Sequence, residues 1–195
     1  MKKLATTAAL LLSACVSIPA FATSIVGATE IKITSAIPDY LQVAELEAFN
    51  LWGTNVAQAL NGGMATGSST YSSFSTPDKA IDGKEGGNYY SDTIFHSAGT
   101  SGAEFLDVRF AASDLSSVMI FGRTDCCTAR DVYNIQIFNA AGKSLFSGKL
   151  DASGGSAGVG FSPAQVAEPA GLALSGIGLA LAGAAARSRR KAANA

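Results

Sequence analysis

Hydrophobic and polar positions alternate in short runs between about residues 25 and 150. The runs are rich in β-branched and aromatic residues, and polar segments that contain Gly and Ser separate them. They predict strands at 30–34, 41–49, 104–110, 117–123, 132–138 and 143–150. The segment "NAAGKS" predicts a hairpin turn between the last two, with Gly142 at a positive φ. Only Val56–Leu60 hints at a helix, so the pattern predicts an antiparallel β-sandwich.

Two polar segments stand out against these runs. The stretch 61–92 is long for so small a domain, which makes it a candidate binding loop. The segment that begins "DASGGSAGVG" at Asp151 predicts a flexible Gly/Ser-rich linker over 151–165. The sandwich domain is therefore expected over 23–150.

The first 22 residues have the features of a secretory signal peptide. Lys2 and Lys3 precede an apolar run, and Ala20-Phe21-Ala22 forms a small-x-small cleavage site. A competing interpretation is a lipid-anchored N-terminus at Cys15, in "LSAC". The residues after Cys15 stay apolar, where a lipoprotein usually turns polar, and this favours simple cleavage after Ala22.

The C-terminal segment 166–195 has a different character. No residue is charged from Pro169 to Ala186, and "RSRRK" follows. About 18 apolar residues are just enough to cross a bilayer as a helix, and the basic cluster would stay cytoplasmic. The alternative is an apolar helix packed on the domain.

The charge of the chain changes when both ends are set aside. The whole chain has 14 Lys and Arg against 15 Asp and Glu. Six of the basic residues and one acidic residue lie in the ends, which leaves 8 against 14 and a net charge of −6. A nucleic-acid partner is therefore not expected.

Scarce cationic side chains gather in one pattern, His96 followed by Arg123-x-Asp125-x4-Arg130. The chain has one histidine, and only one other arginine, Arg109, precedes the basic tail. Guanidinium forks suit sugar hydroxyls or a carboxylate, and Asp125 can orient one of them. The alternative is a structural network of salt bridges at a sheet edge.

Cys126 and Cys127 lie side by side within this pattern. After signal cleavage they would be the only thiols of the chain, in an oxidising compartment. A disulfide between neighbours needs a non-strand backbone, and such distorted segments tend to occur at binding sites. Two reduced, separately buried thiols are the alternative.

The segments "AIDGKEGGNYYSDTIFH" and "GRTDCCTAR" resemble F-type lectins, fucose-binding proteins with a discoidin-like β-jelly-roll. The resemblance implies that His96, Arg123 and Arg130 bind the sugar and that Asp125 supports them. It further implies that Cys126 and Cys127 form a disulfide that lies against the sugar ring. Tyr89 and Tyr90 would surround the methyl group of the sugar. The match is specific over 78–138 and looser over 30–77 and 139–150.

The same resemblance implies a structural calcium ion. Asp82, Thr93 and Glu45 would supply side-chain oxygens, and Lys79 and Lys84 would supply carbonyls, which are hard ligands suited to calcium. The alternative for Asp82-Gly83 is an ordinary turn.

The chain departs from the lectin pattern in three ways. Phe105-Leu106 replaces a pair of tryptophans, and the long-range disulfides of the family have no cysteines here. The segment 40–57 resembles the closing strand of the family but comes first. The domain is therefore expected to be circularly permuted, with this strand completing the sheet.

The C-terminus resembles a PEP-CTERM sorting signal, with a degenerate motif at Ala167-Glu168-Pro169. This implies processing by an exosortase-like enzyme in a Gram-negative bacterium, after transient anchoring in the inner membrane. A plain membrane anchor is the alternative.

Together these features favour an exported, non-catalytic module that binds a glycan or exopolysaccharide at the outer surface or in the matrix. The alternative is a structural or adhesive matrix protein without sugar recognition. An enzyme is not expected, because the sole histidine belongs to the sugar pattern and no acid/base pair is evident.

Overall fold

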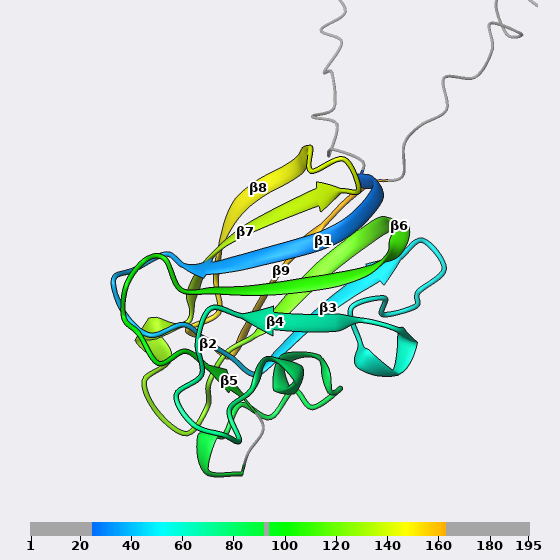
Figure 1. The fold of residues 1–195 in the computed structure, drawn as a ribbon. Helices are drawn as coiled ribbons and strands as arrows, with labels where there is room; N and C mark the ends of the chain where they lie inside the picture. Colours follow the sequence, from blue (N-terminus) through cyan, green and yellow to red (C-terminus); the bar gives the residue numbers. More distant parts are fainter. Residues whose placement is uncertain (1–24, 92–93, 163–195) are drawn as a thin grey trace, which may run out of the picture.

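The computed structural model describes residues 25–91 and 94–162, which form an all-β fold of antiparallel strands, as predicted (Figure 1). The strands are β1 (Ile25–Ser35), β2 (Gln42–Val43), β3 (Glu45–Asn50), β4 (Met64–Gly67), β5 (Phe95–His96), β6 (Phe105–Phe121), β7 (Val132–Asn139), β8 (Ser144–Asp151) and β9 (Ser156–Gly160). Short 3₁₀ turns are η1 (Ala59–Asn61), η2 (Pro77–Ile81), η3 (Tyr89–Ser91) and η4 (Thr128–Arg130).

Alternation along the central strands builds the core. In β1, Ile31 and Ile33 are completely buried, while Glu30 before them and Lys32 between them are more accessible. β7 runs antiparallel to β1 and has the same pattern, with Tyr133, Ile135 and Ile137 completely buried. Period-two burial of this kind fixes the register, because a slip by one residue would turn the apolar set outward.

β6 joins two predicted strands into one. The runs 104–110 and 117–123 were expected to be separate, but β6 continues through the polar segment between them. Leu115 is buried there, and Asp114 accepts a hydrogen bond from the Gly27 N–H at 2.9 Å. One apolar anchor and one side-chain acceptor therefore keep the segment in the sheet.

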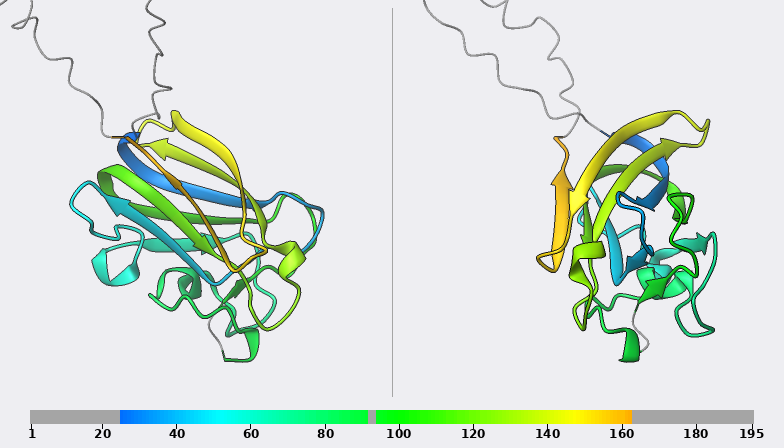
Figure 2. Two further views of the ribbon diagram at one scale, coloured as in Figure 1. Left: turned by 180° about the vertical axis from the view of Figure 1, so that it is seen from behind. Right: turned by 90° about the vertical axis from the view of Figure 1, so that its left-hand side faces the viewer.

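Because β6 is long, its two halves have different neighbours. The first half lies between β4 and β1, and the second half lies between β3 and β9. β1 continues to β7 and then to β8. The sheet folds over as a result, so that β9 lies behind β1 in Figure 1 and in front of it in the reverse view of Figure 2.

The prediction that residues 151–165 form a flexible linker is wrong for much of this segment. Ser156–Gly160 forms β9, which pairs with β6 from Ser117 to Phe121. Phe161 is buried and stacks edge-on against Phe146, with ring centroids 5.3 Å apart. Glycine and serine do not prevent a strand here because backbone pairing and one terminal aromatic side chain hold it.

The hairpin turn between β7 and β8 is confirmed. Gly142 has a φ of 71°, and its N–H donates to the Asn139 carbonyl. The sequence indicated a helix near Val56–Leu60, but the structure has only the short 3₁₀ turn η1 there.

The two terminal segments, 1–22 and 166–195, lie outside the described residues, as does Thr93. None of the helices within residues 25–91 and 94–162 has the length and hydrophobicity to span a bilayer.

Candidate functional site

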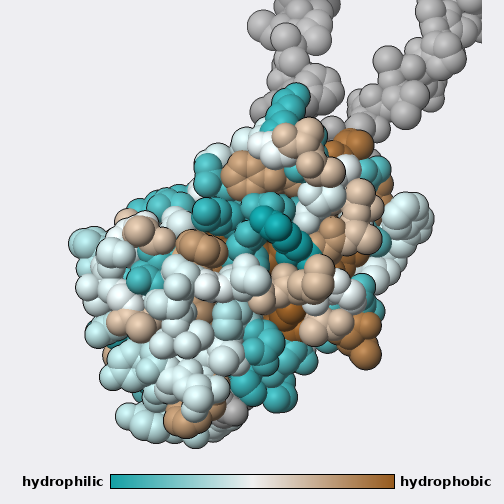
Figure 3. Space-filling view, in the orientation of Figure 1, coloured by the Kyte–Doolittle hydropathy of each residue, from teal (hydrophilic) through white to brown (hydrophobic). Residues whose placement is uncertain are grey.

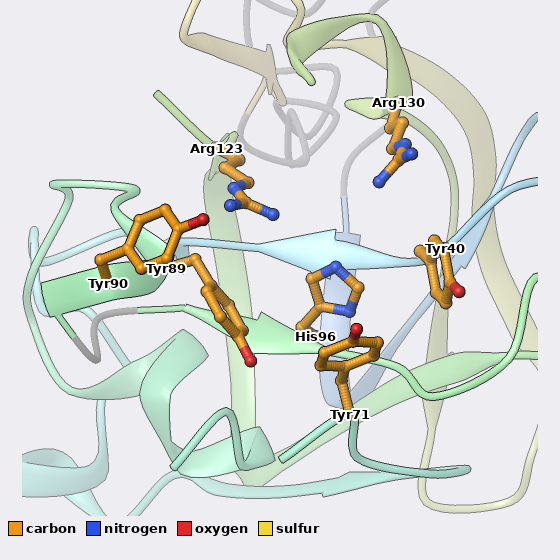
Figure 4. A pocket seen from close by; sticks show the side chains of 7 residues that line it. All are labelled: Tyr40, Tyr71, Tyr89, Tyr90, His96, Arg123 and Arg130. Carbon is orange, nitrogen blue, oxygen red and sulfur yellow. The ribbon is translucent and has the colours of Figure 1, made fainter. Parts of the chain in front are cut away.

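A pocket of about 190 Å³ opens at the end of the fold that carries β2 and β5 (Figure 4). Three of its lining residues are the predicted cations His96, Arg123 and Arg130. The other four are tyrosines: Tyr40, Tyr71, Tyr89 and Tyr90. Figure 4 shows both guanidinium groups directed toward the space above the imidazole ring of His96. The structure thus brings together side chains that are up to 90 residues apart in the chain.

His96 lies at the base of the pocket in a fixed orientation. It pairs with Gln42 across β2 and β5, and its Nδ1 donates to the Ser97 carbonyl at 2.8 Å. Burial lowers the pKa of His96, and the nearby Arg123 and Arg130 lower it further. A neutral ring that donates through Nδ1 carries its acceptor at Nε2, which suits a ligand hydroxyl group.

Tyrosine rings surround this imidazole. The ring centroids of Tyr40 and Tyr71 each lie 5.0 Å from that of His96, and the centroid of Tyr89 lies 5.7 Å away. Tyr89 also stacks edge-on with Tyr90 at 5.7 Å. These contacts give the pocket a rigid apolar wall with hydroxyl groups at its edge. Such a wall suits ligands that combine an apolar face with hydroxyl groups, as carbohydrates do.

Arg123 is held by a two-pronged ion pair. Its Nε and Nη2 donate to the two carboxylate oxygens of Asp125, each at 2.8 Å. Asp125 also accepts the Tyr89 N–H at 3.1 Å, and the guanidinium lies 5.0 Å from the centroid of the Tyr89 ring. The hydrogen bond from Arg123 lowers the pKa of Asp125. Asp125 is thus placed to orient Arg123, as predicted, and the remaining guanidinium N–H groups can serve a ligand.

Arg130 approaches from the other side and has its own carboxylate. Its Nε donates to Asp39 at 3.1 Å, and its guanidinium lies 5.3 Å from the centroid of the Tyr40 ring. Each arginine therefore has one acidic partner and one aromatic neighbour. With a neutral His96, the group as a whole carries no net charge.

A buried carboxylate that the sequence did not single out fixes the loop that carries both arginines. Asp131 is completely buried, and it accepts the Arg123 N–H at 2.8 Å, the Gln42 amide at 2.9 Å and the Tyr133 hydroxyl at 3.2 Å. Burial raises the pKa of Asp131 to about 6. We call this group the Asp131 cluster; it connects the end of the loop to its beginning and to β2 and β7.

Two glycines allow the close packing of this loop. A Cβ on Gly122 would lie 2.5 Å from an oxygen of Asp131. A Cβ on Gly87 would collide with the Gly122 carbonyl oxygen, and the Gly87 carbonyl itself accepts the Thr124 N–H at 2.6 Å. The turn η3 with Tyr89 and Tyr90 is held against the arginine loop by this contact.

Cys126 and Cys127 form a disulfide, as expected. Cys127 has a φ of 61° and its carbonyl accepts the Gln42 amide at 3.2 Å. A left-handed conformation is unusual outside glycine and reverses the chain between the two arginines. The pair does not belong to the lining of the pocket, although Cys127 is exposed in the same loop.

The residues expected to hold calcium come together only in part. Glu45 is completely buried; its Oε1 accepts the Gly83 N–H at 3.1 Å, while its Oε2 is buried with no hydrogen-bond partner in the described residues. Burial, with a smaller effect of Asp82, raises the pKa of Glu45 to about 8. Asp82 forms an ion pair with Lys84 at 3.2 Å, which is exposed at the lysine end.

No group of three or more His, Cys, Asp or Glu side chains that could hold a metal gathers within residues 25–91 and 94–162. The main chain of Lys79 lies in η2 and donates to the Thr76 carbonyl. A calcium ion beside Glu45 would therefore depend on carbonyl oxygens as well as carboxylates. The buried oxygen of Glu45 without a partner is the observation that fits a hard cation.

Sequence reasoning missed five residues of the site. They are Asp39, Tyr40, Gln42, Tyr71 and Asp131. A signal for Asp131 existed, because an acidic residue directly follows Arg130 at the end of the arginine pattern. The tyrosines carried no such signal, since only the fold brings them to His96.

Comparison of the chain with protein families, curated proteins and solved structures finds no match.

Proposed function

We propose that this protein is a non-catalytic carbohydrate-binding module that takes a neutral, fucose-type sugar in the pocket above His96. The observation that supports the proposal most strongly is the convergence of His96, Arg123 and Arg130 inside a wall of tyrosines. Guanidinium donors, an imidazole acceptor and aromatic faces match the hydroxyl groups and the apolar face of a sugar ring.

The charge balance of the pocket favours a neutral ligand. Asp125 and Asp39 already pair with the two arginines, and the lowered pKa of His96 keeps its ring uncharged near pH 7. A carboxylate or phosphate ligand would have to compete with these partners. Sugar hydroxyls can instead accept hydrogen bonds from the guanidinium N–H groups that the two ion pairs do not occupy.

The resemblance to F-type lectins extends this proposal to the fold and to the rim of the site. The antiparallel sheet is compatible with a circularly permuted discoidin-like jelly-roll, in which β3 supplies the displaced strand. Cys126–Cys127 would contact the sugar from the loop between the arginines, and Tyr89 and Tyr90 would surround its methyl group.

Calcium forms a second part of the proposal. Glu45 and Asp82 would hold the ion together with main-chain carbonyls of Lys79 and Lys84 and with Thr93. The ion would supply positive charge to a carboxylate that otherwise stays protonated in its buried position. Its role would be structural, because it would tie β3 to the segment after η2.

Export and display complete the proposed function. A signal peptide at 1–22 would export the domain, and a sorting signal at 166–195 would anchor it transiently in the inner membrane. After processing, the domain would be displayed on the outer surface or in the matrix of a Gram-negative bacterium. Binding to exopolysaccharide in many copies would offset the weak affinity expected of one shallow site.

A glycan array tests the sugar site with matched variants. Arg123→Ala and Arg130→Gln remove donors of the pocket, whereas Arg109→Ala removes an exposed arginine of β6 that pairs with Glu30. We expect binding of fucosylated glycans to weaken by roughly 10- to 100-fold in the first two variants and to stay unchanged in the third. If the unmodified protein binds no glycan, the adhesive matrix protein becomes the better hypothesis.

A further inference from the structure

Exposed apolar side chains gather around the middle of β6, far from the pocket. Trp52, Val26 and Leu51 are 81%, 52% and 43% exposed. On the face shown in Figure 3, hydrophobic residues lie in small groups among polar ones. A group of exposed apolar side chains, unlike a single one, is typical of a contact with a protein or a membrane.

Hydrogen bonds connect these three residues to the same point of β6, with Val26 on the β1 side and Leu51 and Trp52 on the β3 side. The Asp114 side chain accepts the Gly27 N–H at 2.9 Å, next to Val26, and the Asp114 carbonyl accepts the Leu51 N–H at 3.2 Å. Trp52 follows Leu51 directly, and its N–H donates to the Asn50 side chain at 3.0 Å. We call Val26, Leu51 and Trp52 the apolar end.

The described chain ends at the same place. The Phe161 N–H donates to the Ser116 carbonyl at 2.7 Å, and the Ser116 hydroxyl donates to the Asn50 carbonyl at 3.0 Å. Ser162 therefore lies close to the residues that precede Leu51. Figures 1 and 2 show that β1 begins and β9 ends at one end of the fold, whereas β2 and β5, which carry the pocket, lie toward the other.

The sequence after Ser162 limits how far this end can be from a membrane. Six residues, 163–168, separate Ser162 from the uncharged apolar segment that starts at Pro169. Six residues span at most about 20 Å when fully extended. If residues 169–186 are inserted in a bilayer, Ser162 lies within about that distance of the lipid, and the apolar end is next to it.

We propose that the apolar end rests on the lipid bilayer while the C-terminal segment is inserted, so that the sugar pocket faces away from the membrane. Tryptophan prefers the interface between lipid and water, and leucine and valine beside it add apolar area. The Asp114 carboxylate, which accepts from Gly27 at this end, is an anion, so these contacts give no reason to expect a requirement for anionic lipids. This inference rests on the membrane-anchoring part of the proposed function and not on the sugar site.

Trp52 reports on the contact directly because it is the only tryptophan of the chain. The full chain is incorporated into phosphatidylcholine vesicles with and without brominated acyl chains, and the emission of Trp52 is recorded. We expect the emission to move to shorter wavelength in the vesicles and to lose intensity in the brominated ones. A chain that ends at Ser162 should keep the emission of an exposed tryptophan.

Two variants retain Trp52 as the reporter and distinguish the apolar end from another exposed apolar position. Leu51→Lys should reduce the quenching, and Leu60→Lys, a change at an exposed leucine of η1, should not. Addition of phosphatidylglycerol should leave the quenching unchanged.

Three outcomes would overturn the inference. They are a full chain that does not float with the vesicles, a floating chain whose Trp52 emission is not quenched, and a concentration-dependent shift without vesicles, which would indicate a second copy as the partner. Fucose binding measured in the same vesicles shows independently whether the sugar site works.

Discussion

Two completely buried carboxylates, Asp131 and Glu45, differ in how their oxygens are used. Three donors bond to Asp131, from Arg123, Gln42 and Tyr133. Glu45 has one donor at Oε1, and its Oε2 has no partner in the described part of the chain. The pKa values follow this difference, since burial raises the pKa of Asp131 to about 6 and that of Glu45 to about 8.

The comparison distinguishes Asp131, a buried carboxylate that the chain's own donors stabilise, from Glu45, which we propose that an added ion stabilises. Asp131 is ionised near pH 7 because its donors compensate much of the cost of burial. Glu45 lacks enough donors, so it binds either a proton or a cation. The first carboxylate fixes the arginine loop of the proposed sugar site, and the second is the place where we propose that calcium binds.

Asp131→Ala should have the largest effect. It leaves the buried Arg123 N–H and one N–H of the Gln42 amide without their acceptor, so the free energy of unfolding should fall by about 3–5 kcal/mol. The Tyr133 hydroxyl keeps its bond to the Gln42 carbonyl at 2.7 Å. Fucose binding should be lost with it. Urea denaturation checks the stability, and Asp151→Ala, at an exposed carboxylate that accepts from Ser153, serves as the control with little change. Unaltered stability in Asp131→Ala would show that the cluster is not a support.

Glu45→Gln should matter only in the presence of calcium. The amide has the shape of the protonated acid, so in EDTA at pH 7 both proteins should unfold at similar urea concentrations. Calcium at 100 times its Kd should stabilise the unmodified protein by about 2.7 kcal/mol. The variant should gain much less. Equal stabilisation of both proteins would contradict a calcium site at Glu45.

The stability of the calcium-free protein should fall as the pH rises. The pKa of Glu45 is raised from 4.5 to about 8, so the folded state binds a proton that the unfolded state releases. The stabilisation is complete below about pH 4.5 and is lost on the way to pH 8, with a loss on the order of 2 kcal/mol from pH 5 to pH 7.

Other groups titrate in the same range, so the difference between two proteins is the quantity to measure. Asp131 acts in the same direction up to about pH 6, whereas the lowered pKa of His96 acts in the opposite one. Subtracting the urea-unfolding curve of Glu45→Gln isolates the contribution of Glu45. A difference that does not depend on pH would refute the raised pKa.

Lys84→Ala should have the smallest effect. Its ion pair with Asp82 is exposed at the lysine end, and such pairs contribute less than about 0.5 kcal/mol. Removing Lys84 should nevertheless tighten calcium binding slightly, because one positive charge leaves the neighbourhood of Asp82. A calcium titration followed by thermal unfolding measures the change, and weaker binding in the variant would go against the proposed site.

The local part of this structure could be predicted from sequence, and the non-local part could not. Alternation in β1 and β7 and the turn at Gly142 are properties of short segments, so the pattern reveals them. The continuity of β6 depends on the contact of Asp114 with Gly27, which lies 87 residues away. β9 likewise depends on β6 as a partner, which is why its Gly/Ser composition was misleading.

The same division holds at the pocket. Arg123, Asp125 and Arg130 form one local pattern, and their proximity followed from it. Tyr40 and Tyr71 come from distant segments and reach His96 only through the fold. The function of Asp131 also depended on its partner Gln42, which no periodicity connects to it.

The most direct test of the sugar site uses His96, the only histidine of the chain. Its imidazole gives one set of ring proton signals by NMR, which can be followed during a titration with L-fucose. We expect these signals to shift and reach saturation in the unmodified protein and in Arg109→Ala, but not in Arg123→Ala. Signals that stay unchanged at fucose concentrations where a glycan array reports binding would place the sugar elsewhere and contradict the proposed site.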